Sequence, residues 1–157
     1  MNTSAALKFS DEIVMAKFFA NLPLNITEDP IVMGTLGGYE LAAPMSFWDA
    51  SEELRNAITG GCGPGGAGDM LVPDTIYLLK VTLACKIHDF CYAIWNSPEG
   101  FIKANNIFKN NMLRIINQHG SWCSQLHYLR KKRTIKYYKA VKYFGETSYF
   151  DSHLQYI

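Results

Sequence analysis

Apolar side chains recur every three or four residues over most of the second half of the chain, which is the spacing of one face of a helix. Three helices are predicted there, over residues 82–96, 98–118 and 124–144. Thr82 is a plausible cap for the first, and Pro98 suits the first position of the second. Gly120 can end the second helix. Its inward stripe consists of Phe101, Asn105, Phe108, Met112 and Ile115.

The first third of the chain has a different pattern, in which proline and glycine separate short apolar pieces. A short helix is predicted over residues 10–20, with Ser10 as its cap. Turns and one small hairpin are expected around Tyr39–Leu41. We therefore predict an irregular N-terminal extension over residues 1–58 and a mainly α-helical domain over residues 59–157, built on two long antiparallel helices.

A glycine-rich run, Gly60 to Gly68, precedes the helices. Such a run cannot form a stable helix or strand interior, because glycine loses the most backbone entropy on ordering. A run of this kind is usually a flexible linker. Cys62 lies within it and could anchor it, so it could also be a tight loop that points bare carbonyl or amide groups at a ligand.

Composition adds bounds to this picture. The chain has 157 residues, of which 48% are hydrophobic and 18% charged, as in globular proteins. No secretory signal or membrane-spanning segment is apparent, so we expect a cytoplasmic protein or one released by a non-classical or phage-linked route. The net charge is +1, but seven of the 15 Lys and Arg residues lie between Arg130 and Lys142.

That basic run has two interpretations. A solvated helix face is the more common one, and contact with anionic lipid is the other, because aromatic and aliphatic residues interleave the cations. Nucleic acid is not expected as a partner, since no recognised binding module accompanies the charge.

Candidate chemistry lies at His88 and Asp89, within the first predicted helix. Neighbouring helical residues point about 100° apart, so the two side chains cannot easily face one small ion. They can serve adjacent tasks, because Asp89 offers hard oxygen ligands to calcium and His88 is a base that titrates near neutral pH. Histidine in a helix is also often a core residue that bonds a backbone carbonyl.

Here the sequence resembles phospholipase A2. The segment Cys62-Gly63-Pro64-Gly65-Gly66 looks like the calcium loop, and Ala84-Cys85-x-x-His88-Asp89-x-Cys91-Tyr92 looks like the catalytic helix. The segments 72–85 and 105–114 are closest to the bacterial and fungal secreted branch. The sequence also looks like uncharacterised bacterial and phage-borne relatives that share the loop and the His-Asp helix. The resemblance covers residues 60–116.

The resemblance implies calcium-dependent hydrolysis of the middle-position (sn-2) ester of glycerophospholipids at a membrane surface. His88 would take a proton from the attacking water, and Tyr92 would brace the two helices. Calcium would be bound by Asp89 and by backbone carbonyls of the loop, at Gly61, Gly63 and Gly65. A disulfide would join Cys62 to Cys85.

Two departures from the family pattern weaken the expected activity. Asn105 stands where the family has an aspartate that orients and balances the histidine, and it cannot offset a forming imidazolium. Gly60 stands where the bacterial branch has an aspartate ligand, although Asp69 or Asp74 could compensate. The alternative function is therefore a catalytically weakened fold that binds a membrane or a partner. Asn105 could also be a buried hydrogen-bonding residue without a catalytic task.

The cysteines allow further alternatives. Cys85, His88 and Cys91 are spaced three apart, and Cys62 or Cys123 could complete a zinc site. On a straight helix, however, side chains three and six residues apart point in directions too different to bind one ion. Cys91 or Cys123 as a nucleophile beside His88 lacks activating neighbours. A disulfide between Cys91 and Cys123 is also compatible with the sequence.

Overall fold

A computed structural model of the chain describes residues 17, 29–60, 75–147, 149 and 150. The first elements are the strands β1 (Ile31–Leu36) and β2 (Tyr39–Pro44), followed by the helices α2 (Met45–Asp49) and α3 (Glu52–Gly60). A second hairpin, β3 (Thr75–Ile76) and β4 (Leu79–Lys80), leads into α4 (Thr82–Ile94), α5 (Pro98–His119) and α6 (Ser124–Phe144). The described structure is therefore mainly helical, with two small antiparallel hairpins.

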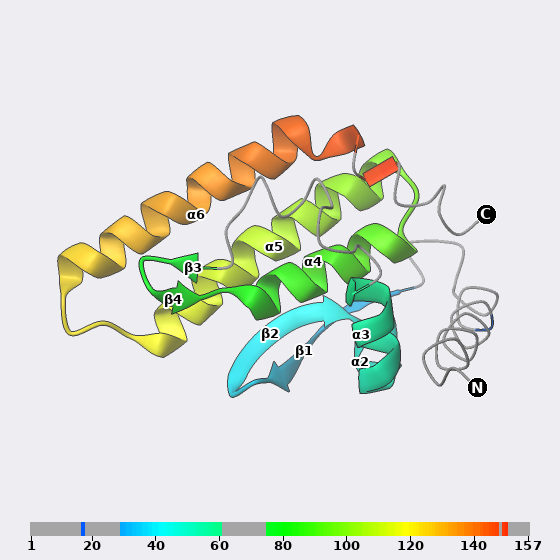
Figure 1. Ribbon diagram of the computed structural model, residues 1–157, viewed down its shortest axis with the longest axis horizontal. Helices are drawn as coiled ribbons and strands as arrows, with labels where there is room; N and C mark the ends of the chain where they lie inside the picture. The colour runs from blue at the N-terminus through cyan, green and yellow to red at the C-terminus, as the bar shows by residue number, and fades with distance from the viewer. Residues whose placement is uncertain (1–16, 18–28, 61–74, 148, 151–157) are drawn as a thin grey trace, which may run out of the picture.

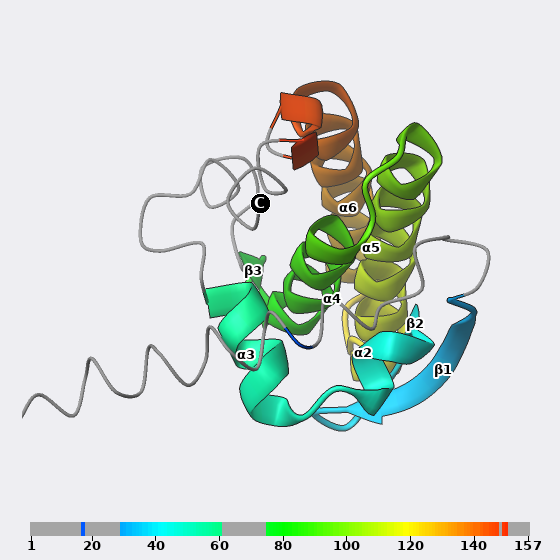
Figure 2. The same cartoon turned by 90° about the vertical axis from the view of Figure 1, so that its right-hand side faces the viewer.

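The three long helices lie side by side and alternate in direction, with α5 in the middle (Figures 1 and 2). The three helices predicted from periodicity are confirmed to within two residues at each end. Pro98 begins α5 and Gly120 ends it with a φ of 69°, as expected. Ser97 caps this helix, since its hydroxyl accepts from the Gly100 amide at 3.0 Å. The predicted cap of α4 is wrong. Val81 occupies that position, and Thr82 is already helical.

The inward stripe predicted for α5 is confirmed. Asn105, Phe108, Met112 and Ile115 are buried, and Phe101 is half-buried at the start of the helix. Asn105 is thus a polar side chain among apolar ones, and it needs hydrogen-bond partners inside the protein.

The described part of the N-terminal third is more regular than the sequence pattern predicted. The small hairpin is confirmed, with Leu36 paired to Tyr39 across a two-residue turn. The helices α2 and α3 follow it directly, and α3 extends across the boundary expected between residues 58 and 59. Its Leu54 and Ile58, with Leu41 and Phe47, belong to the same hydrophobic core as the long helices. These buried side chains make the segment from β1 to α3 part of the core. Of the helix predicted over residues 10–20, only Lys17 lies within the described residues, and it is helical.

Side-chain amides of α5 bind the free edge of β2. Asn111 accepts from the Ala42 amide at 2.9 Å and donates to the Ala42 carbonyl at 2.7 Å. Gln118, two helical turns later, makes the same pair of bonds to Glu40 at 2.7 and 2.9 Å. These bonds satisfy backbone groups that an edge strand otherwise leaves open, and they set the hairpin against α5 on the side away from α6 (Figure 2).

The β3–β4 hairpin lies along α6. Arg130 Nη2 donates to the Tyr77 carbonyl at 3.1 Å, and the Tyr137 hydroxyl donates to the Thr75 carbonyl at 3.3 Å. Arg130 is buried, whereas Lys132, Arg133, Lys136, Lys139 and Lys142 are exposed. The basic run is therefore a solvated face with one internal arginine, whose task is to hold the second hairpin.

The chain after α6 packs back onto the start of α5. Tyr149 is fully buried, and its hydroxyl accepts from the Ser97 amide at 3.0 Å and donates to the Ser97 carbonyl at 2.9 Å. Its burial raises its pKa to about 12.

Within the described segments, no helix is both long enough and apolar enough to cross a bilayer.

Candidate active site

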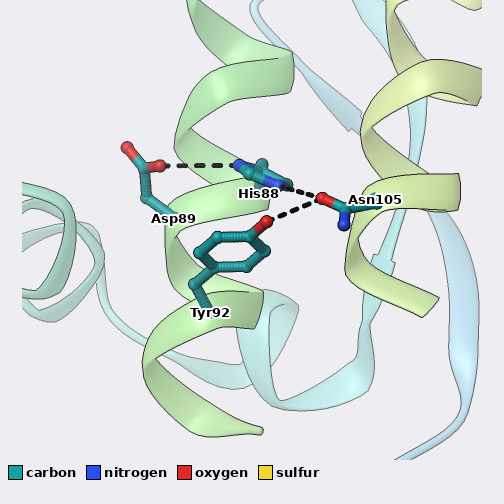
Figure 3. Close-up of polar contacts among 4 residues, drawn as sticks. All are labelled: His88, Asp89, Tyr92 and Asn105. Atoms are coloured by element: carbon teal, nitrogen blue, oxygen red, sulfur yellow. Dashed lines mark hydrogen bonds and ion pairs between the residues drawn. The ribbon is translucent and has the colours of Figure 1, made fainter. Parts of the chain in front are cut away.

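His88 and Asn105 face each other across the contact between α4 and α5. His88 Nε2 lies 2.9 Å from Asn105 Oδ1 (Figure 3). An amide oxygen can only accept, so Nε2 carries the proton in this arrangement and donates it. Nδ1 then keeps its lone pair, which is the form of the imidazole that can take a proton.

Tyr92 lies one turn beyond His88 and joins the same amide. Its hydroxyl donates to Asn105 Oδ1 at 2.7 Å, so this one oxygen receives two hydrogen bonds from α4. Burial raises the pKa of Tyr92, while its bond to Asn105 lowers it by a smaller amount. The phenol therefore remains a protonated donor near neutral pH. The structure thus brings together His88, Tyr92 and Asn105, as the resemblance implied.

Two aromatic rings pack against the imidazole. The ring centroids of Tyr92 and Phe108 lie 4.0 and 4.6 Å from that of His88. Only 7% of His88 is exposed. The ring therefore has little freedom to rotate, and its two nitrogens keep their separate directions. Phe108 was predicted as a core residue but not as a neighbour of His88. Its place on α5, three residues after Asn105, is the signal that could have indicated it.

Asp89 lies on the outer side of α4, beyond His88 from Asn105 (Figure 3). Its Oδ1 is 3.7 Å from His88 Nδ1, and 47% of its side chain is exposed. That distance is too long for a hydrogen bond, and the carboxylate would attract the ring only once His88 is protonated. A half-exposed carboxylate beside the unprotonated nitrogen is a hard oxygen donor of the kind that calcium prefers.

The loop expected to complete the calcium shell lies outside the described residues. This applies to Gly61, Gly63 and Gly65, and also to Cys62, Asp69 and Asp74. Gly60 is the last residue of α3, which contacts α4. Of the predicted calcium ligands, only Asp89 lies within the described residues.

The alternatives based on cysteine find no support. In the described parts of the chain, no three His, Cys, Asp or Glu side chains are placed to share a metal ion, so a zinc site built on Cys85, His88 and Cys91 is not formed there. Cys91 is fully buried, and burial raises its pKa well above the usual value, so it is an inert thiol and not a nucleophile. Cys91 and Cys123 form no disulfide with each other.

Comparison of the chain with models of protein families, with curated proteins and with solved structures found no match. The interpretation of the site therefore depends on its own geometry. Its decisive features are the protonated Nε2, the unprotonated Nδ1 and the carboxylate on the Nδ1 side.

Proposed function

We propose that this protein is a calcium-dependent hydrolase of the sn-2 ester of glycerophospholipids. The observation that carries the proposal is the orientation of His88. Its Nε2 donates to Asn105, which leaves Nδ1 unprotonated on the side of Asp89. A base of this kind, next to a hard carboxylate, suits water attack on an ester that a divalent cation activates.

In the proposed reaction, Nδ1 of His88 takes a proton from a water molecule while the water oxygen bonds to the ester carbonyl carbon. The imidazolium then returns that proton to the leaving alkoxide, which gives a free fatty acid and a lysophospholipid. Asn105 and Tyr92 position the ring, because the Asn105 oxygen holds Nε2 and the Tyr92 hydroxyl fixes that oxygen. Phe108 packs against the ring and restricts its rotation.

Asp89 is the described residue that would hold calcium, together with the predicted carbonyls of Gly61, Gly63 and Gly65. Calcium bound there would polarise the ester carbonyl and stabilise the oxyanion. The partial exposure of Asp89 fits this task, since a carboxylate that binds a cation and a substrate must remain accessible.

The test is release of fatty acid from vesicles of 1-palmitoyl-2-oleoyl phosphatidylglycerol. We expect oleate and not palmitate to be released in the presence of calcium, with no release in EGTA. His88→Ala should lose the activity, whereas His127→Ala, the same change in a histidine of α6, should keep it. Release that is unchanged by EGTA or by His88→Ala would contradict the proposal.

Asn105 favours a second candidate function, a phospholipase-like fold that binds membranes without efficient catalysis. A neutral amide cannot offset the positive charge that forms on His88 during turnover. In this case neither the natural chain nor Asn105→Asp would release oleate, although both would still bind the vesicles.

A further inference from the structure

The two hairpins have turns of the same length but different chemistry. The β1–β2 turn consists of Gly37 and Gly38, with φ angles of 56° and 83°. The β3–β4 turn consists of Tyr77 and Leu78, with φ angles of 46° and 67°. Glycine adopts such left-handed angles without strain, whereas a side chain with a Cβ atom resists them. The second turn is therefore strained where the first is not.

The strained turn presents Leu78 to solvent. The side chain is 97% exposed, so no internal packing compensates for its unfavourable backbone angle. The turn is held in place from inside by Arg130, whose guanidinium donates to the Tyr77 carbonyl. Strain that the surroundings maintain at an exposed position is typical of functional segments.

Other exposed apolar residues lie at the same end of the molecule. The α5–α6 connection carries Trp122, which is 98% exposed, and it lies at the same end of the fold as the β3–β4 turn (Figure 1). Tyr128 and Leu129, near the start of α6, are exposed and line a shallow hollow with Ser124 and Gln125. We call Leu78, Trp122, Tyr128 and Leu129 the apolar end.

Cations stand next to the apolar end. Lys131, Lys132 and Arg133 follow Leu129 and the buried Arg130 on α6, and this helix contains no Asp or Glu. Apolar side chains at the tips of turns, with cations behind them, match an anionic bilayer, whose acyl layer accepts the former and whose phosphates bind the latter. Nucleic acid would use the cations but would give no reason for exposed leucines.

We propose that the apolar end is a membrane-docking surface, at which Leu78 and Trp122 enter the bilayer while Lys132 and Arg133 bind the phosphates of anionic lipids. An anionic membrane is the partner that the proposed phospholipid hydrolysis needs, and the choice of a phospholipid surface rests on that proposed function. Binding itself requires no chemistry.

The test uses vesicles of diether phosphatidylglycerol and diether phosphatidylcholine, which have no ester to hydrolyse, in EGTA. Leu78→Gly should weaken sedimentation with the vesicles about tenfold, since transfer of one leucine side chain is lost. Lys132→Ala should weaken it about fivefold. Ile102→Gln, at an exposed apolar position near the other end of α5, should have no effect on binding. Leu78→Met should bind as the natural protein does, because it keeps an apolar side chain at the turn. Trp122 emission should shift to the blue on binding.

A second measurement separates function from folding. Leu78→Gly relieves the left-handed strain, so its urea midpoint should rise while its affinity for vesicles falls. Unchanged affinity in Leu78→Gly, an equal loss in Ile102→Gln, or preference for duplex DNA over vesicles at the same salt would overturn the proposal. His88→Ala should bind normally. If vesicle binding depends on Leu78 but no oleate is released, only the proposed hydrolysis is contradicted. If oleate is released but binding does not depend on Leu78, only the proposed docking surface is contradicted.

Discussion

Replacement of Asn105 by aspartate tests the proposed role of His88 most directly. Asn105 Oδ1 already accepts from His88 Nε2 at 2.9 Å and from the Tyr92 hydroxyl at 2.7 Å. Within the described residues, Asn105 Nδ2 is buried and has no hydrogen-bond partner. Aspartate keeps the acceptor, removes the unpaired donor and adds a negative charge beside the ring that becomes positive during turnover.

The size of the effect follows from two opposing terms. Unit charges about 4 Å apart attract by about 4 kcal/mol at an effective dielectric constant of about 20. Removal of a buried carboxylate from water costs several kcal/mol, part of which appears as lower stability of the folded protein. If about half of the attraction stabilises the transition state, about 2 kcal/mol remains, which corresponds to a rate increase of about 10- to 100-fold.

The assay is kcat for oleate release as a function of pH, with urea unfolding measured in parallel. We expect a higher plateau, an acidic limb displaced to higher pH, because the carboxylate favours the protonated ring, and a lower urea midpoint. A lower plateau in Asn105→Asp would refute the reasoning. So would ¹⁵N NMR spectra of the natural protein that place the imidazole proton on Nδ1, since the amide would then donate to Nε2.

Two further predictions concern packing around the site. Gly100→Ala should lower the free energy of unfolding by about 1–3 kcal/mol in urea titrations, because the new Cβ would lie 2.5 Å from the Tyr149 hydroxyl oxygen and 2.7 Å from Trp95 Cβ; an unchanged midpoint would contradict this tight contact. Burial raises the pKa of Cys91, so its thiol stabilises the folded state below the unfolded-state pKa, and this contribution is lost as the pH rises above about 9. Urea midpoints between pH 7 and 11 should therefore fall less steeply in Cys91→Ala, and equal slopes would be evidence against this linkage.

Local patterns in the sequence predicted the helices well. The bounds of α5 follow from Ser97, Pro98 and Gly120, and its inward stripe from 3.6-residue periodicity. The same periodicity placed Asn105 inside and one turn pattern placed a hairpin at Tyr39–Leu41. These features depend on neighbours within a few residues, which a sequence displays directly.

Contacts between distant segments could not be obtained in this way. The binding of Asn111 to Ala42 makes the N-terminal hairpin part of the core, and it joins residues 69 positions apart. Arg130 appeared to be one of several surface cations until the structure placed it inside against Tyr77. Its burial depends on where the β3–β4 hairpin packs.

The sequence by itself determined which residues lie on one face of each helix, because that follows from the helical repeat. It therefore brought His88 and Tyr92 to one side of α4 and turned Asn105 inward on α5. Only the tertiary structure decided that these faces meet, with one amide oxygen accepting from both side chains and Nδ1 left toward Asp89. The physical reason is that the relative position of two helices is set by the packing of many side chains at once, whereas the face of a single helix is set by its backbone geometry alone.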